Sequence, residues 1–369
     1  MALKTVTGDH GAAHKGRGAT LNPEGRFESL QREAFDDGWE PGEADEPGRP
    51  KTTVTPEHAK TIITRNDSPD VPFTFSINPY RGCEHGCIYC YARPSHAYVN
   101  LSPGVDFETR LFAKVNAADL LRSELSKPGY RCELISVGAN TDPYQPIERD
   151  YRITRSILEV LAECNHPVGI VTKNAMVERD IDILAPMAEK NLVNVYVSLN
   201  NLDHGLARRL EPRCSAPSRR LEAMRRLSSA GIPVGVLVAP VIPFLTDHEI
   251  EPVLEAAYAA GARSAAYVLM RLPYEVKDLF RDWLEVHYPL KAKHVMSRVH
   301  QMRGGRDNDP SFVSRMSGTG EFAALLGKRF DIACQRLGFN AERLNRSATT
   351  TMFTPPRSLT PEEKQMPLF

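Results

Sequence analysis

Three cysteines within a span of eight residues are the part of this sequence best suited to chemistry. Cys83, Cys87 and Cys90 follow the spacing Cys-x3-Cys-x2-Cys, and Gly82 and Gly86 precede the first two. Glycine allows the positive φ and close backbone approach that a loop around an inorganic cluster requires. Three thiolates hold three irons of a four-iron cluster and leave the fourth without a protein ligand. The pattern therefore predicts an iron–sulfur cluster with one iron open to a small molecule.

A zinc site is the main alternative interpretation of these cysteines. His85 or His96 would then be the fourth ligand of a tetrahedral site. Structural zinc sites usually combine two separated pairs of ligands, and the sequence has no second close pair of cysteines. The cysteine count of seven is odd, which disfavours a disulfide framework. We expect the other four cysteines to be free and partly buried thiols; they are Cys132, Cys164, Cys214 and Cys334.

The motif Cys-x3-Cys-x-aromatic-Cys, with Tyr89 as the aromatic residue, resembles the cluster motif of the radical S-adenosylmethionine superfamily. The resemblance implies that Cys83, Cys87 and Cys90 ligate a [4Fe–4S] cluster whose open iron chelates S-adenosylmethionine. It also implies an external electron donor such as flavodoxin or ferredoxin. One electron would cleave the cofactor to a 5′-deoxyadenosyl radical, which abstracts hydrogen from a substrate. The protein would place the cofactor and exclude water.

Short β-branched segments alternate with amphipathic helical patterns from residue 71 to residue 273. The expected strands are 73–78, 133–138, 168–172, 193–199, 234–241 and 265–270. The expected helices between them are 116–125, 154–163, 180–189, 219–230 and 248–260, with Asn116 and Asp247 as candidate N-caps. Repeated strand–helix–strand units with right-handed crossovers form a parallel sheet. We therefore predict an α/β fold, an incomplete (β/α)6 TIM-like barrel, as the superfamily resemblance also implies.

The rest of the 369 residues flanks this barrel. Residues 1–70 are polar and rich in glycine and proline, so we expect an arm that is partly disordered. Residues 274–345 are expected to form a helical extension with helices at 276–286 and 320–338, followed by a flexible tail at 346–369.

The amino-acid composition says less about the function of this protein than the cysteine motif does. Lysine plus arginine equals aspartate plus glutamate at 46 each, so no overall charge points to nucleic acid or excludes it. No apolar segment approaches the roughly 18 residues of a membrane span. The first residues lack the apolar core of a signal peptide. We expect a cytoplasmic protein that does not enter a membrane.

The order of motifs at the predicted strand ends is similar to that of spore photoproduct lyase and its nearest relatives. The matching pieces are Thr141-Asp142, Val171-Thr172-Lys173, Ser198-x-Asn200, Leu210-Glu211-Pro212 and Val238-Ala239-Pro240. The resemblance implies that Thr141, Lys173 and Ser198 bind the methionine part or ribose of the cofactor. Adenine would lie near Tyr89 and Ala239. Asn200 alternates with Ser198 and would point the same way.

The sequence departs from these lyases at the hydrogen donor. They carry a cysteine after the second strand, whereas this chain has Gly138-Ala139-Asn140 there. Repair of thymine dimers by that route is therefore not implied. Tyr144 is a candidate substitute donor, with a packing role as its alternative.

Two further features concern partners. Seven arginines between residues 208 and 226 form either a phosphate-binding stripe or a solvated helix face. The C-terminal Gln365-Met366-Pro367-Leu368-Phe369 resembles the peptide by which bacterial repair proteins bind the sliding clamp, with Gln365, Leu368 and Phe369 as contacts. DNA in a repair context is thus the leading substrate hypothesis. The alternatives are a DNA-repair accessory protein with a structural cluster, and a radical enzyme that modifies RNA or protein.

Overall fold

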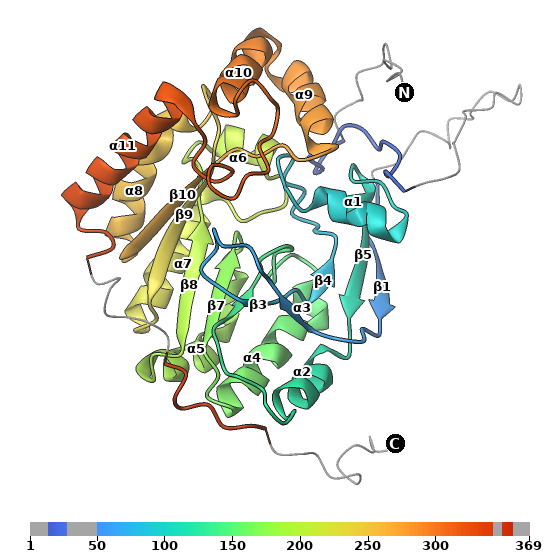
Figure 1. Ribbon diagram of the computed structural model, residues 1–369, viewed down its shortest axis with the longest axis vertical. Helices are drawn as coiled ribbons and strands as arrows, with labels where there is room; N and C mark the ends of the chain where they lie inside the picture. Colours follow the sequence, from blue (N-terminus) through green and yellow to red (C-terminus); the bar gives the residue numbers. More distant parts are fainter. Residues whose placement is uncertain (1–13, 28–49, 342–348, 357–369) are drawn as a thin grey trace, which may run out of the picture.

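The computed structural model describes residues 14–27, 50–341 and 349–356. Its main sheet has seven strands in the order β10-β9-β8-β7-β6-β3-β2 (Figure 1). Their bounds are β2 (Ile63–Arg65), β3 (Phe75–Ile77), β6 (Ile135–Val137), β7 (Val168–Thr172), β8 (Val193–Ser198), β9 (Val234–Val241) and β10 (Ser264–Leu269). All neighbours are parallel except β2, which is antiparallel to β3. The six predicted strands are confirmed in position and parallel order, and within the described residues the sheet stays open.

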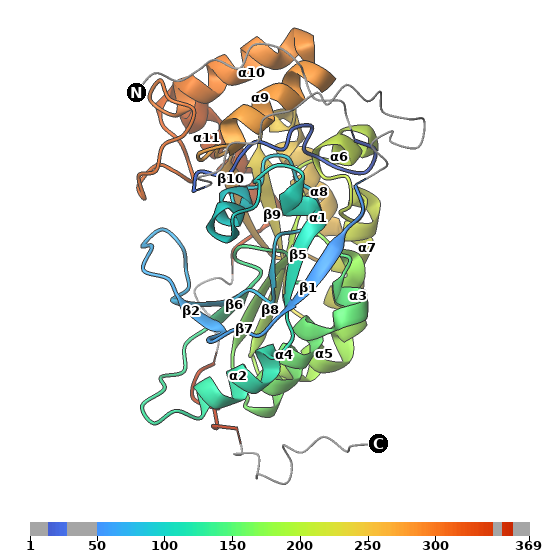
Figure 2. The ribbon, with the colours of Figure 1, turned by 90° about the vertical axis from the view of Figure 1, so that its right-hand side faces the viewer.

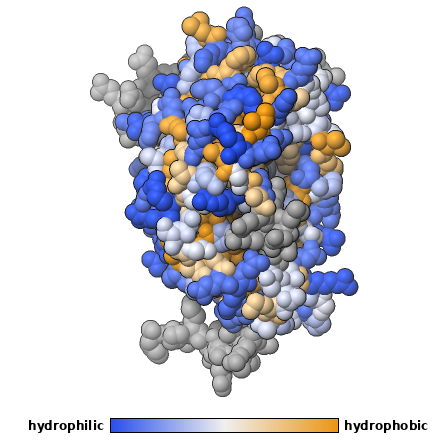
Figure 3. Space-filling model, turned by 90° about the vertical axis from the view of Figure 1, so that its left-hand side faces the viewer, coloured by the Kyte–Doolittle hydropathy of each residue, from blue (hydrophilic) through white to orange (hydrophobic). Residues whose placement is uncertain are grey.

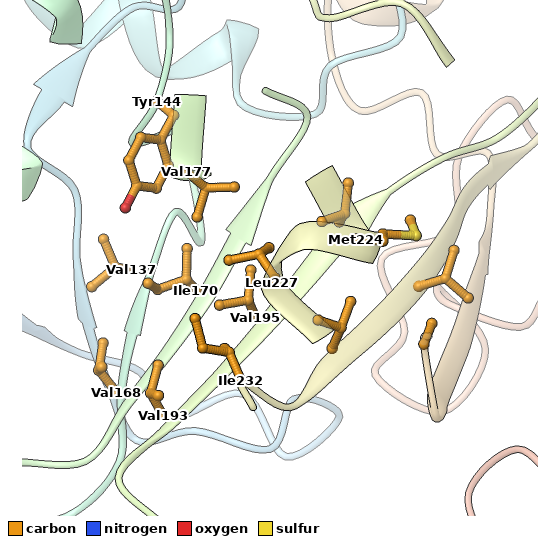
Figure 4. Close-up of a cluster of buried hydrophobic side chains, with 14 of the residues drawn as sticks. Val137, Tyr144, Val168, Ile170, Val177, Val193, Val195, Met224, Leu227 and Ile232 are labelled. Atoms are coloured by element: carbon orange, nitrogen blue, oxygen red, sulfur yellow. The ribbon is translucent and has the colours of Figure 1, made fainter. Parts of the chain in front are cut away.

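Helices follow the strands and cover one face of the curved sheet (Figures 1 and 2). They are α2 (Ala117–Leu125), α3 (Glu148–Tyr151), α4 (Ile153–Glu163), α5 (Ile181–Glu189), α7 (Pro217–Ser229) and α8 (Ile250–Ala259). α6 (His204–Leu210), which follows β8, instead packs its buried leucines in a separate cluster with residues 276–284. Buried aliphatic side chains from strands and helices, such as Ile170, Val195 and Leu227, form the core between the layers (Figure 4). This burial explains why the helical and β-branched patterns could be recognised in the sequence.

Three further helices follow β10 as a helical C-terminal part. They are α9 (Val276–His287), α10 (Pro289–Met302) and α11 (Gly320–Leu337). α11 packs beside α8, where Arg329 and Glu251 form an ion pair (Figure 1). The face shown in Figure 3 is mainly hydrophilic with smaller hydrophobic areas. None of the helices in the described part of the chain is long and apolar enough to cross a bilayer.

The arm at residues 1–70 contains more regular structure than its composition predicted. β1 (Thr53–Glu57) pairs with β5 (Arg110–Lys114), which also pairs with β4 (Tyr80–Arg81), and β2 extends the main sheet. The Glu124 carboxylate accepts the backbone N–H groups of residues 62 and 63 at 2.8 and 3.0 Å. These bonds join segments far apart in the sequence, which a local pattern does not reveal.

The two candidate N-caps have different outcomes. Asn116 does occupy the N-cap of α2, but its side-chain amide bonds instead to the backbone N–H and C=O of Ala59, both at 3.0 Å. Asp247 lies inside a short 3-10 helix (Asp247–Glu249) rather than before a helix.

The buried His166 predicts how stability depends on pH. Its Nδ1 donates to the carbonyl of Pro167 at 3.0 Å, so its Nε2 accepts the hydroxyl of Tyr130 at 2.8 Å. Burial lowers the pKa of His166 from 6.5 to about 4. Between these values the unfolded chain binds a proton that the folded chain does not, so stability should fall as pH decreases. The decrease in the free energy of unfolding that is due to His166 should be nearly complete at pH 4 and amount to about 3 kcal/mol at most.

This prediction is checked by measuring the free energy of unfolding from pH 7 to pH 4. His166→Gln should reduce the acid loss relative to the wild type. A variant at residue 166 with the wild-type acid slope would contradict the assignment.

Candidate functional site

The cysteine loop, residues 82–92, follows β4 and holds the three thiols. Cys83 and Cys87 are buried, Cys90 is half-buried, and all three line one cavity. Gly82 and Gly86 have φ values of +72° and +66°, in agreement with their predicted role. A Cβ atom on either glycine would lie 2.6 Å from a neighbouring side chain. Only glycine therefore fits this path of the backbone without displacement of its neighbours.

Arg93 holds the loop from behind. Its guanidinium donates to the carbonyls of Cys87 at 2.9 Å and Gly86 at 3.2 Å, and to two carbonyls at residues 103–104. It also forms an ion pair with Glu108 at 2.5 Å, and both side chains are 0% exposed. The bonds of one buried group thus fix the backbone carbonyls on both sides of the Cys87 side chain.

The N-terminal segment 14–27 covers the same region. Its backbone N–H groups at Gly18 and Ala19 donate to the Glu108 carboxylate at 3.0 and 2.8 Å. A Cβ atom on Gly18 would lie 1.8 Å from the carbonyl oxygen of Gly86. This part of the predicted arm is therefore in direct contact with the cysteine loop.

The cavity that the three thiols line has a volume of about 1100 Å³ and lies at the carboxyl ends of the parallel strands. Seven of the predicted site residues line it together: Cys83, Cys87, Tyr89, Cys90, Lys173, Ser198 and Ala239. They come from the cysteine loop and from the ends of β7, β8 and β9. Strand ends that are distant in sequence thus meet at one site, as expected for a barrel of this kind.

Two predicted cofactor residues have polar groups free for a ligand. The Ser198 hydroxyl is buried and has no hydrogen-bond partner. Lys173 is half-buried; burial lowers its pKa, but the charges of Cys87 and Glu211 outweigh this and raise it above its ordinary value. Asn200 also has an unpartnered buried amide nitrogen, but it does not line the cavity and its Oδ1 accepts a bond from Asn201 at 2.7 Å.

Asp142, which lines the cavity, connects the end of β7 with the cysteine loop. Its carboxylate accepts the Thr172 hydroxyl and the Lys173 backbone N–H, both at 2.7 Å, and lies 3.3 Å from the Nδ1 of His85. Burial alone would raise the pKa of Asp142 and lower the pKa of His85. The attraction between the two groups outweighs burial, so the pKa of Asp142 is lowered and the pKa of His85 is raised. His85 is therefore a charged link between the cysteine loop and the end of β7.

Besides Asn200, two more predicted residues, Thr141 and Tyr144, lie outside the cavity lining. Thr141 is buried and its hydroxyl donates to the carbonyl of Tyr80 at 2.9 Å, so the hydroxyl is already used. Tyr144 is fully buried among the core side chains (Figure 4). Its hydroxyl donates to the carboxylate of Asp180 at 3.0 Å. The positions of these two side chains correspond to structural roles, including the packing alternative for Tyr144.

A buried polar network under the cysteine loop was not predicted as such. The Tyr89 hydroxyl and the Arg220 guanidinium both bond to the Glu211 carboxylate. Burial would raise the pKa of Glu211, but Arg220 and Lys173 hold it below its ordinary value. Glu211 belongs to the Leu-Glu-Pro motif, which was the available signal for this network.

Cys214 also lies closer to the site than its isolated position in the sequence indicated. It is free and half-buried, as expected, but its sulfur is 3.7 Å from the sulfur of Cys87.

The donor set fits a cluster better than a single zinc ion. Among the described residues, no three His, Cys, Asp or Glu side chains converge on one metal position. His96 bonds through Nε2 to the carbonyl of Arg110 at 2.9 Å, and His85 is engaged by Asp142 and Asn174. A cubane binds its three cysteines at different irons and needs no such convergence.

Comparisons with known proteins show the family of this chain. The family model described as the radical SAM superfamily matches residues 77–257. An uncharacterized protein of Mycobacterium tuberculosis is 37% identical over 245 residues, which cover 66% of this chain and 71% of that protein. One of Methanocaldococcus jannaschii is 28% identical over 228 residues, covering 61% and 80%.

Among solved structures, spore photoproduct lyase complexed with dinucleoside spore photoproduct has a TM-score of 0.54 at 15% identity, covering 78% of this chain and 80% of that one. At this identity the likeness shows a shared fold. The chain belongs to the radical S-adenosylmethionine superfamily and is a radical enzyme of a family that uses S-adenosylmethionine and a [4Fe–4S] cluster.

Proposed function

We propose that this protein binds a [4Fe–4S] cluster through Cys83, Cys87 and Cys90 and acts with S-adenosylmethionine on DNA. The observation that supports the proposal most strongly is that these three thiols line the same cavity as Lys173 and the unpartnered hydroxyl of Ser198. An external electron donor such as flavodoxin or ferredoxin remains part of the proposal.

The residues of the cavity have distinct proposed roles. When bound, the cluster and S-adenosylmethionine supply a 5′-deoxyadenosyl radical that takes a hydrogen atom from the substrate. Lys173 binds the carboxylate of the cofactor, since a partly buried ammonium attracts an anion strongly. The Ser198 hydroxyl donates to a polar atom of the same molecule. Tyr89 and Ala239 offer apolar surface to the adenine.

Anaerobic reconstitution with iron and sulfide tests this proposal. The reconstituted protein should hold about four irons and, after reduction, convert S-adenosylmethionine to 5′-deoxyadenosine. A protein that holds a cluster but forms no 5′-deoxyadenosine would instead support the alternative of an accessory protein with a structural cluster. A protein that binds no cluster would contradict both.

Replacement of Lys173 by methionine should weaken cofactor binding. A hydrogen bond to a charged group contributes about 1.5–3 kcal/mol, so the Kd for S-adenosylmethionine should rise about ten-fold or more. Equilibrium binding to the reconstituted protein measures this, with unchanged iron content as a requirement. Lys190→Met is the matched control, because Lys190 bonds to Asn165 at the surface. Equal affinities of the two variants would contradict the role of Lys173.

Positive and aromatic side chains around the cavity support DNA as the substrate. The cations that line it are Lys60, Arg65, Arg81, Lys114, Lys173, Arg271 and Arg315. Two lining tyrosines, Tyr91 and Tyr98, are 47% and 71% exposed and offer ring faces to bases. The structure of spore photoproduct lyase, whose fold is similar, contains a bound dinucleoside spore photoproduct.

The arginines of α7 contribute less to this proposal than their number suggested. Arg219 and Arg226 both form ion pairs with Glu178, at 3.2 and 3.0 Å, and Arg225 pairs with Glu222. The solvated-face interpretation therefore fits this helix better than a phosphate-binding stripe.

Crosslinking in cells followed by sequencing separates the possible clients. Enrichment of DNA would support the proposal, whereas enrichment of RNA or of a protein would replace it with the corresponding alternative. The clamp-like residues Gln365, Leu368 and Phe369 lie outside the described residues, and binding of a sliding clamp stays a prediction.

A further inference from the structure

Arg271 is a cavity arginine that forms no ion pair among the described residues; the charge of Asp70, which pairs with Arg315, acts on it more weakly than the charge of Arg315 does. Arg271 follows β10, the last parallel strand, and is half-buried. Its Nε is buried and has no hydrogen-bond partner, and one Nη lies 3.7 Å from the sulfur of Met316, a weak acceptor. Within the described residues no carboxylate pairs with it. A half-buried guanidinium in this state is a binding group for an anion that the protein itself does not provide.

The other three arginines that line the cavity differ from Arg271, because each of them forms an ion pair among the described residues. The pairs are Arg65–Asp67, Arg81–Glu57 and Arg315–Asp70. The Arg315 charge also lies near enough to lower the pKa of Arg271, after burial as the larger cause. An anion bound at Arg271 would offset both the unfavourable burial of its charge and the repulsion by Arg315.

The aromatic ring of Tyr91 lies next to the Arg271 guanidinium. Tyr91 follows Cys90 directly, its hydroxyl donates to the carbonyl of Ala139 after β6, and the centre of its ring is 5.2 Å from Cζ of Arg271. The ring therefore spans the cavity mouth between the ends of β6 and β10. Contact with an aromatic face orients a guanidinium but does not neutralise its charge.

We propose that Arg271 binds a phosphodiester group of the DNA substrate, while the exposed ring of Tyr91 stacks on an adjacent base. This inference rests on the proposed function and names the contact by which the substrate is held. The planar fork of arginine matches phosphate oxygens, and aromatic rings bind bases of any sequence. Lys173 follows β7 and Arg271 follows β10, so the two cations come from different strand ends and serve two different anions.

The position of the site has a consequence for the form of DNA. The reacting atom must enter a cavity lined by the cysteine loop, and a base within a duplex cannot do so without leaving its stack. The target nucleotide is therefore single-stranded or turned out of the helix, and single-stranded DNA is the appropriate probe.

Fluorescence anisotropy with the reconstituted protein and labelled single-stranded oligodeoxythymidylate tests the proposal. Arg271→Gln should raise the Kd for this probe about ten-fold or more, and Arg271→Lys should restore part of the affinity because it retains the charge. Arg263→Gln, an equal charge change at an exposed arginine outside the cavity lining, should bind like the wild type. A probe with a neutral methylphosphonate backbone should bind weakly to the wild type, and Arg271→Gln should weaken it little further.

Cofactor binding distinguishes the substrate contact from a cofactor contact. Arg271→Gln should keep the wild-type Kd for S-adenosylmethionine; a rise in that Kd with unchanged DNA binding would overturn the inference. DNA binding by Arg271→Gln equal to that of Arg263→Gln would also overturn it. Absence of 5′-deoxyadenosine formation by the wild type, in contrast, would refute the proposed function itself.

Discussion

Replacement of Cys83 by alanine should leave a protein that folds but forms no 5′-deoxyadenosine above background. The thiol lies in the cavity beside the two other cysteines, so its loss leaves two protein ligands for a cluster that needs three. The backbone N–H of Cys83 donates to the carbonyl of Phe107 at 2.9 Å, a bond that alanine retains. Iron counting and spectroscopy after anaerobic reconstitution, together with product analysis, measure the effect.

Cys132→Ala is the matched control, because Cys132 is a half-buried thiol outside the cavity lining. It should keep the iron content and turnover of the wild type. Cys87 requires a double variant, since the sulfur of Cys214 lies 3.7 Å from its own and offers a replacement ligand. Wild-type iron content in Cys83→Ala, or in Cys87→Ala with Cys214→Ala, would contradict the assigned ligands.

The parallel sheet could be predicted because its signal is local. Buried β-branched strands such as β7 and β9 are continuous apolar runs, and they match the predicted bounds of 168–172 and 234–241 without shift. The alternation of strands and helices then determines which strand ends meet. This is why Lys173 and Ser198, which lie at the ends of different strands, could be predicted to lie near the cysteine loop.

Loop side chains were harder to predict than strand ends. Thr141 and Asp142 are neighbours, yet Asp142 lines the cavity while the Thr141 hydroxyl bonds to the carbonyl of Tyr80. The direction of a side chain in an irregular loop depends on its tertiary partners, and periodicity carries no information about them. The same limit applies to Tyr144, whose partner Asp180 is 36 residues away.

Two arginines, one behind the cysteine loop and one in the cavity lining, could not be singled out from residue types alone. Arg93 and Arg271 are each one arginine among many in the sequence. The structure distinguishes them through their surroundings: four backbone carbonyls and a carboxylate around Arg93, and no carboxylate paired with Arg271 within the described residues. Whether a buried charge has an ion-pair partner depends on the tertiary structure, so the residue type alone does not reveal it.

The buried pair of Arg93 and Glu108 gives the largest expected effect on stability. Glu108→Gln removes the negative charge that pairs with the fully buried guanidinium of Arg93. It also replaces one carboxylate oxygen by an NH2 group, which cannot accept a hydrogen bond from the backbone N–H groups of Gly18 and Ala19. Removal of one partner of a buried pair costs about 3–5 kcal/mol. Glu255→Gln is the control, because Glu255 and Arg336 are 52% and 59% exposed and such surface pairs contribute less than about 1 kcal/mol. Denaturant unfolding of the cluster-free proteins compares the two, and equal small losses would show that this pair does not hold the cysteine loop in place.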